Sequence, residues 1–183
     1  MIPTTPSQTV GPYLHIGLNW EDGAFVTAAS DPAGFWIRGS VIDGNGEVVP
    51  DALIETWQAD PDGRFNHPDD PRGAFEYAGF RGFGRSDTVS GEYAIFTRKP
   101  GQVPDLIDDT FQAPHLDVSI FARGVLKRII SRIYFQDESS NATDKVLLSI
   151  PAERRSTVIA KKSADGYRLD FYLQGEQESV FFQ

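Results

Sequence analysis

Short apolar stretches recur along the chain and are bounded by Gly, Pro, Asn and Asp, the pattern of β-strands separated by turns. This pattern predicts strands over residues 35–42, 47–57, 92–98, 115–122, 127–135 and 167–174. The turn Asp43-Gly44-Asn45-Gly46 predicts a hairpin between the first two strands, because glycine and asparagine tolerate positive φ. Pro50 marks an edge or a bulge in the second strand.

The predicted strand over residues 115–122 alternates clearly, so its side chains should divide between two faces. One face is apolar and predicts core: Leu116, Val118, Ile120 and Ala122. The other is mostly polar and should meet solvent, a cleft or a partner: His115, Asp117, Ser119, Phe121 and Arg123. His115 and Asp117 therefore lie side by side, as two metal ligands would, although an ordinary polar strand face is the commoner arrangement.

Helix candidates are few, and only residues 151–161 predict a short helix, opening with proline in its first turn. The fold class predicted is all-β, a two-layer β-sandwich formed by one domain over residues 1–183. Residues 58–90 and 99–114 are long connecting loops, which in compact domains are usually functional or cover an interface. Residues 1–20 predict an extended N-terminal arm that packs on another surface.

The composition and net charge exclude several classes of site and partner. The 183 residues are 40% hydrophobic, enough for a core without cross-links, and contain no cysteine, which excludes disulfides, thiolate zinc sites and cysteine nucleophiles and fits a cytoplasmic location. The net charge of −9 would repel phosphate backbones, so we expect no nucleic-acid partner. We expect no membrane partner and no secretory signal, because no apolar run is long enough to cross a bilayer and the N-terminus has no apolar signal region. A small anionic substrate would need a local cation.

Arg123 is the candidate for that cation, because its planar guanidinium suits a carboxylate and it stands just before the Gly124 turn. The alternative is a surface arginine paired with one of the 26 acidic residues. A second candidate lies in the arm, where Gly11-Pro12 fixes a bend and Thr9 and Tyr13 supply hydroxyl groups, although an ordinary turn would look the same.

Two metal sites can be considered around the His115–Asp117 pair. A ferrous facial triad would need a second histidine, and the chain offers only His15 and His67, both upstream, where the usual arrangement takes it from downstream. A ferric site built from two tyrosinates and two imidazoles cannot be recognised from spacing alone. The sequence contains no phosphate loop on a strand–helix junction, no nucleophile elbow and no convincingly spaced catalytic carboxylates.

Six segments together resemble one known family, in the order in which they occur there: TPSQTVGPYLHIGL, GSVIDGNGEVVPDALIETWQADPDGRF, GFGRSDTVSGEYAIFTRKPG, APHLDVSIFARG, RIYF and YRLDFYLQGEQESVFF. The chain is similar to the intradiol ring-cleaving dioxygenases over nearly its whole length. TPSQTVGPY and SIFARG are the most specific segments, and they resemble the family's iron-free alpha subunits.

The resemblance implies a β-sandwich in which iron-bearing members hold ferric iron through two tyrosines and two histidines. His115 matches one of these ligands, but Arg72, Val103 and Asp117 occupy the positions of the other three. Tyr77 lies close enough to Arg72 for a loop shift to confuse that one position. The resemblance therefore implies that this chain has no metal ligands and no catalytic residue, and that Fe(III) belongs to a partner subunit.

Further implications concern the partner and the substrate. The chain is expected to be inactive alone, to pair with an iron-bearing beta subunit through its arm, and to assemble as pairs into larger particles. Thr9, Gly11, Pro12 and Tyr13 would line the substrate pocket, and Arg123 would bind the carboxylate of a small aromatic acid. The reaction implied is insertion of O2 between the two hydroxyl-bearing carbons of a catechol ring. The alternative function is a stand-alone β-sandwich module that binds a small aromatic acid.

Overall fold

The computed structural model describes residues 3–72, 77, 79–105 and 110–182. Within these residues the chain forms mostly strands: β1 (Phe35–Gly39), β2 (Val41–Ile42), β3 (Leu53–Trp57), β4 (Phe83–Asp87), β5 (Tyr93–Thr97), β6 (Val103–Pro104), β7 (Phe111–Gln112), β8 (His115–Phe121), β9 (Ile129–Phe135), β10 (Ile159–Ser163), β11 (Gly166–Arg168) and β12 (Phe171–Tyr172). The helices are short: α1 (Leu14–Leu18), α2 (Lys145–Ser149) and the 3-10 helices η1 (Ser139–Ala142) and η2 (Ala152–Val158). The predicted all-β fold is confirmed.

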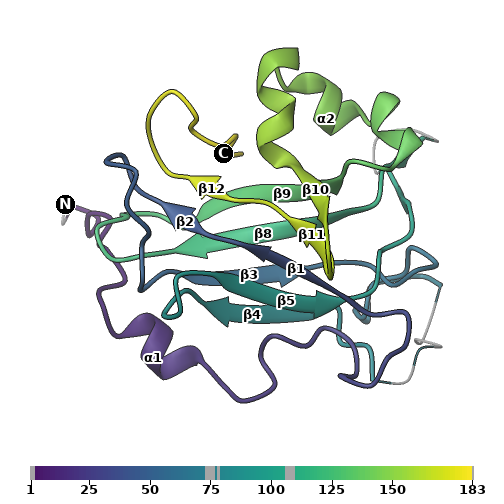
Figure 1. The fold of residues 1–183 in the computed structure, drawn as a ribbon, viewed down its shortest axis with the longest axis horizontal. Helices are drawn as coiled ribbons and strands as arrows, with labels where there is room; N and C mark the ends of the chain where they lie inside the picture. The colour runs from purple at the N-terminus through teal and green to yellow at the C-terminus, as the bar shows by residue number, and fades with distance from the viewer. Residues whose placement is uncertain (1–2, 73–76, 78, 106–109, 183) are drawn as a thin grey trace.

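The strands form two layers that are joined at one edge. Hydrogen bonds connect eight strands in the order β4-β3-β8-β9-β10-β11-β1-β5. Ile159 and Ala160 of β10 pair with β9, whereas the remainder of β10 pairs with β11, so this strand passes from one layer to the other. Figure 1 shows β1, β2, β11 and β12 lying across β3, β8 and β9. The predicted β-sandwich is therefore confirmed.

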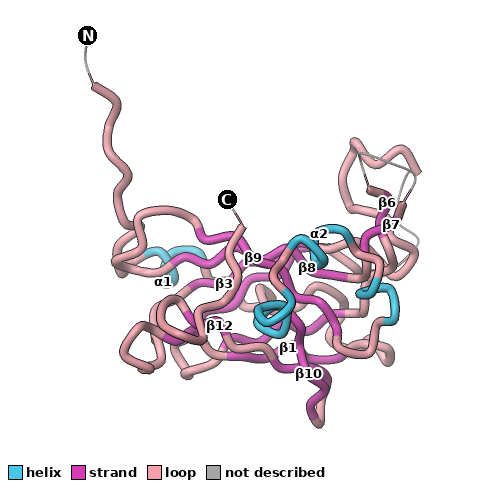
Figure 2. The backbone as a smooth tube through the Cα atoms, turned by 90° about the horizontal axis from the view of Figure 1, so that it is seen from above, coloured by secondary structure: helices cyan, strands magenta, loops and turns pink. Residues whose placement is uncertain are grey.

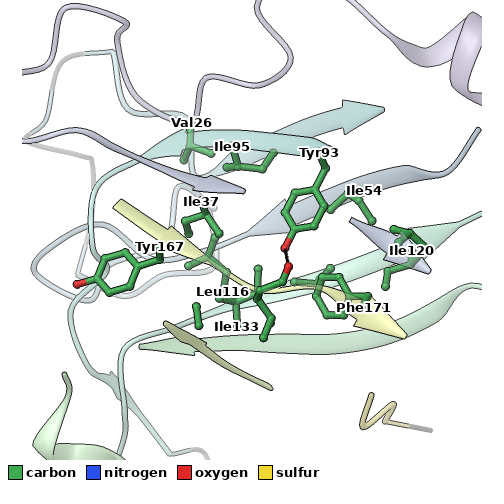
Figure 3. Close-up of a cluster of buried hydrophobic side chains, with 14 of the residues drawn as sticks. Val26, Ile37, Ile54, Tyr93, Ile95, Leu116, Ile120, Ile133, Tyr167 and Phe171 are labelled. Atoms are coloured by element: carbon green, nitrogen blue, oxygen red, sulfur yellow. Dashed lines mark hydrogen bonds between the residues drawn. The ribbon is translucent and has the colours of Figure 1, made fainter. Parts of the chain in front are cut away.

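The core lies between the layers and is drawn in Figure 3. The predicted apolar face of β8 is fully buried, as are its counterparts on the other strands: Ile37, Ile54, Ile95, Leu116, Ile120, Ile133 and Phe171. Tyr93 is buried among them, and its hydroxyl donates to the Leu169 carbonyl at 2.7 Å. Burial raises the pKa of Tyr93, so the phenol stays neutral.

Some predicted elements differ from the observed ones. The turn over residues 43–46 forms, with Gly46 at φ 84°, and Val48 returns to pair with Ile42 in an isolated antiparallel bridge. The regular strand that follows begins only at Leu53 and pairs with β4 and β8 rather than with β1. The first strand breaks at Ser40, whose N–H donates to the Asp170 carboxylate at 2.8 Å instead of to a strand. The strand predicted over residues 167–174 is likewise divided into β11 and β12.

The predicted helix over residues 151–161 is wrong for residues 159–161, which belong to a strand. Residues Ala152–Val158 form the 3-10 helix η2, and the chain then continues as strand β10. The β-branched residues Thr157, Val158 and Ile159 disfavour an α-helix here. The described parts of the two long connections also contain strands that were not predicted, β4, β6 and β7.

The N-terminal arm extends away from the sandwich, as Figure 2 shows, and residues 3–10 are exposed. It is not extended throughout, because helix α1 occupies Leu14–Leu18. Beyond α1 the chain is attached to the sheet, where Trp20 stacks on Phe83 at 6.1 Å and the Arg85 guanidinium donates to the Leu18 carbonyl. Among the described residues no helix is long and apolar enough to cross a membrane.

Candidate functional site

Arg123 lies in the turn that joins β8 to β9, where Gly124 adopts φ 81°. Its Nε donates to Asp51 Oδ2 at 2.9 Å, and its side chain is 62% exposed whereas that of Asp51 is 10% exposed. The alternative anticipated for this arginine, a surface ion pair, is therefore present. The guanidinium nonetheless remains largely open to solvent, so a ligand or a partner can still reach it.

The fold brings the arm to the same turn. The Gly124 N–H donates to Thr9 Oγ1 at 2.8 Å, and the Gly11 N–H lies 3.4 Å from the same hydroxyl oxygen. Gly11 adopts φ 73°, which bends the chain towards Pro12 and the start of α1. Thr9 thus lies beside the Arg123–Gly124 turn although the two segments are far apart in the sequence. The role of these residues in binding a substrate stays a prediction.

Pro12 and Tyr13 are exposed, and Tyr13 has 78% of its surface accessible. Large apolar side chains on the arm and on the β8–β9 turn are similarly open to solvent: Val10, Ile16, Leu18, Trp20 and Leu126. Exposed apolar side chains that adjoin one another are typical of a surface that another protein covers.

The positions that match tyrosine ligands carry no metal donor. Arg72 is paired with Asp70 at 2.8 Å, and this hydrogen bond holds the pKa of the Asp70 carboxyl well below its usual range. Val103 is buried and offers only an apolar side chain. Tyr77 directs its hydroxyl to Asp62 Oδ2 at 3.3 Å, so it is engaged elsewhere in the loop.

His115 is 7% exposed, and its Nδ1 donates to the Ala113 carbonyl at 2.7 Å. Its Nε2 lies 3.9 Å from Asp117 Oδ1. Burial lowers the pKa of His115, and the nearby charge of Arg132 lowers it further, so the imidazole is neutral at pH 7.

Arg132 stands opposite Asp117 on β9 and was not anticipated as a site residue. Its Nε donates to Asp117 Oδ1 at 3.0 Å, and its Nη1 donates to Gln112 Oε1 at 2.9 Å and to the Tyr134 hydroxyl at 3.1 Å. The side chain is only 17% exposed. A signal did exist in the sequence, because counting back from the Gly124 turn pairs residue 132 with residue 117.

The facial triad considered for ferrous iron does not form. His15 lies on α1, and His67 lies in an exposed loop with its Nδ1 3.6 Å from Asp69. Within the described part of the chain, no three His, Asp or Glu side chains are grouped so that they could hold a metal ion.

The two candidate regions lie at opposite ends of the molecule. The seven residues of β8 separate His115 from Phe121 by about 20 Å at the usual rise of a strand, and Arg123 lies beyond. Figure 2 shows the arm at one end of the molecule and β6–β7 at the other. Arg123 and Thr9 therefore cannot share a pocket with the His115–Arg132 cluster of the same chain.

A family model described as "Dioxygenase" matches residues 11–175. The chain belongs to the intradiol dioxygenase family. It is 40% identical to the protocatechuate 3,4-dioxygenase alpha chain of Pseudomonas putida, over 100% of this chain and 97% of that one. It is 30% identical to the protocatechuate 3,4-dioxygenase beta chain of Burkholderia cepacia, over 76% of this chain and 63% of that one.

The fold agrees with this family. The structure of catechol 1,2-dioxygenase from Pseudomonas arvilla C-1 superposes with a TM-score of 0.62 at 18% identity, over 84% of this chain and 56% of that one. Intradiol dioxygenases depend on non-haem iron. Among the described residues, the donors around His115 do not fit ferric iron, because they comprise one imidazole, one carboxylate bound to a guanidinium and a phenol that burial keeps neutral.

Proposed function

We propose that this chain is the iron-free alpha subunit of a protocatechuate 3,4-dioxygenase. The enzyme would cleave protocatechuate, 3,4-dihydroxybenzoate, between its two hydroxyl-bearing carbons and insert both atoms of O2 to yield 3-carboxy-cis,cis-muconate. The full-length similarity to an alpha chain, with weaker similarity to a beta chain, supports this assignment. No relative named above supports a stand-alone binding module.

One observation carries the proposal: the predicted substrate residues lie far from the chain's own His115–Asp117 pair. Thr9 meets the Arg123–Gly124 turn through the Gly124 N–H, beyond the opposite end of β8 and about 20 Å or more from His115. A carboxylate held by Arg123 could not reach the His115 end of its own chain. The substrate residues of this chain would therefore complete a pocket whose iron is held by a neighbouring beta subunit.

The contribution of this chain is then charge and shape. Arg123 supplies a cation for the substrate carboxylate in a protein whose net charge of −9 would otherwise repel it. Thr9 fixes the arm against the Gly124 turn, so that Gly11, Pro12 and Tyr13 form part of the pocket wall. A ferric ion held by the beta subunit would supply Lewis-acid activation of the bound catecholate.

The exposed apolar residues of the arm and of the β8–β9 turn support a permanent alpha–beta interface. We expect residues 1–20 to pack on the beta subunit and the alpha–beta pairs to assemble further. A cytoplasmic location agrees with a chain that contains no cysteine.

The test is to produce the chain alone and together with its beta subunit. Alone, it is expected to contain no stoichiometric iron, to show no tyrosinate-to-iron absorption band and to consume no O2 with protocatechuate. Together, the two chains should co-purify with iron and take up O2 with protocatechuate. Stoichiometric iron or O2 uptake in the chain alone would overturn the proposal, as would a beta subunit that is fully active without it.

A further inference from the structure

The positively charged guanidinium of Arg132 is surrounded by oxygen atoms, as a bound metal cation would be. Three oxygen atoms from three side chains lie within 3.1 Å of its guanidinium nitrogens: Asp117 Oδ1, Gln112 Oε1 and the Tyr134 hydroxyl. They come from β7, β8 and β9, so the guanidinium links three strands. We call Gln112, His115, Asp117 and Tyr134, the side chains around Arg132, the cation niche.

The cation niche also contains a nitrogen donor. His115 Nδ1 is committed to the Ala113 carbonyl, which leaves the lone pair on Nε2, 3.9 Å from Asp117 Oδ1. Tyr134 is held from behind, since its hydroxyl lies 3.2 Å from Asp144 Oδ1. A carboxylate, an amide oxygen, a phenol and an imidazole are a mixed nitrogen and oxygen set of the kind that divalent transition metals accept.

The charges in the niche are balanced by the guanidinium. Arg132 neutralises Asp117, and a second cation placed among the same oxygen atoms would be repelled by the fixed positive charge at close range. The position of the guanidinium is well defined, because the Arg132 side chain is only 17% exposed and forms three hydrogen bonds. Asp117 is 44% exposed, so solvent ions could still reach the niche.

We propose that Arg132 is a built-in cation that takes the place of a metal ion in this chain and excludes metal from the cation niche. Removing its charge would then uncover a latent site for a divalent transition metal such as Co²⁺. The iron-free character of the chain would depend on this added cation as well as on the missing tyrosine ligands. The inference rests on the contacts of Arg132 and does not need the beta subunit.

The experiment titrates Co²⁺ into the full chain and follows the visible absorption of Co²⁺ and the heat of binding. Wild type and Arg132→Lys, which keeps the charge, are expected to bind weakly. Arg132→Ala removes the charge and leaves a cavity, whereas Arg132→Met removes the charge and fills most of the space. Both variants are expected to bind Co²⁺ at least 10-fold more tightly than wild type. Adding Asp117→Asn to either variant should abolish the gain, which ties it to the niche.

Two results would overturn the inference: charge-removing variants that are folded by near-UV circular dichroism yet bind Co²⁺ no better than wild type, or an Arg132→Lys variant that gains as much. If both charge-removing variants are destabilised and partly unfolded at the temperature of the titration, the measurement becomes the rise in Tm on adding Co²⁺, followed from a lower starting temperature. A larger rise than in wild type supports the inference, and an equal or smaller rise overturns it. The titration uses the chain without a partner subunit, so a negative result would leave the proposed assignment as an alpha subunit unaffected.

Discussion

Arg123 illustrates how one residue can be paired and still available. Its Nε contacts Asp51 Oδ2, and the other oxygen of Asp51, Oδ1, is buried without a hydrogen-bond partner among the described residues. An ion pair with one largely exposed member contributes only ~0–1 kcal/mol to stability. The contact with Asp51 therefore orients the arginine more than it stabilises the fold.

Replacing Arg123 with Ala should raise KM for protocatechuate in the assembled enzyme by about 10- to 100-fold, the loss expected for a hydrogen bond to a charged group. The Tm of the chain should hardly change. Arg123→Lys is the matched control, because it keeps the charge but loses the planar fork, and its KM should fall between the two. Steady-state O2 uptake measures all three, and an unchanged KM in Arg123→Ala would show that the residue serves another purpose.

At the scale of elements, helix α2 shows how a short segment is secured. Five residues are too few for a stable isolated helix, so α2 depends on its contacts. Asp144 caps it: the carboxylate accepts the Leu147 N–H at 2.7 Å, the Ala113 N–H at 2.7 Å and the Tyr134 hydroxyl at 3.2 Å. Asp144 is fully buried, so α2 is joined through it to the start of β8 and to β9.

Asp144→Ala should lower the free energy of unfolding by about 2–4 kcal/mol, because it removes a helix cap and leaves buried donors unpaired. Asp144→Asn keeps one acceptor oxygen and should lower the free energy of unfolding by a smaller amount. Asp69→Ala, at an exposed carboxylate, is the control and should change stability by less than about 0.5 kcal/mol. Urea unfolding followed by tryptophan fluorescence measures the series, and equal stability of Asp144→Ala and wild type would contradict the assigned role.

At the scale of the whole molecule, buried and half-buried ion pairs join distant segments. The hydrogen bond from Arg98 lowers the pKa of Asp31 to about 2, and this pair links the loop before β1 to the end of β5. Burial alone would raise the pKa of Asp137. Hydrogen bonds from Lys99, Lys162 and Tyr167 outweigh the effect of burial and lower this pKa to about 2. Both carboxyls have a pKa of 3.8 when unperturbed.

A carboxyl whose pKa is lower in the folded state favours folding above its unfolded pKa and loses that contribution as the pH falls. The free energy of unfolding should therefore be nearly constant from about pH 7 to 5 and should decrease steeply between pH 3.8 and about 2. Asp31→Asn should be less stable at neutral pH and show a shallower decrease. Unfolding by urea at a series of pH values tests this, and identical slopes for the variant and the wild type would refute the role of Asp31.

The sequence alone determined features that depend on neighbouring residues or on the chemical identity of single residues. The period of two over residues 115–122 identified β8 and its buried face, because alternation depends only on neighbouring residues. The resemblance to the family, which rests on sequence alone, places Arg72 and Val103 where iron-bearing members have tyrosine ligands. The β-rich pattern likewise predicted the sandwich, whereas the short elements β4, α2 and β10 carry too weak a local signal.

Only the tertiary structure decided which distant residues meet. Docking of the arm set Thr9 against Gly124, at a separation of 115 residues. The same packing moved the partner of β3 from the preceding strand to β4 and β8. Such contacts depend on register and on the burial of a shared core, which are properties of the folded chain and leave no local pattern in the sequence.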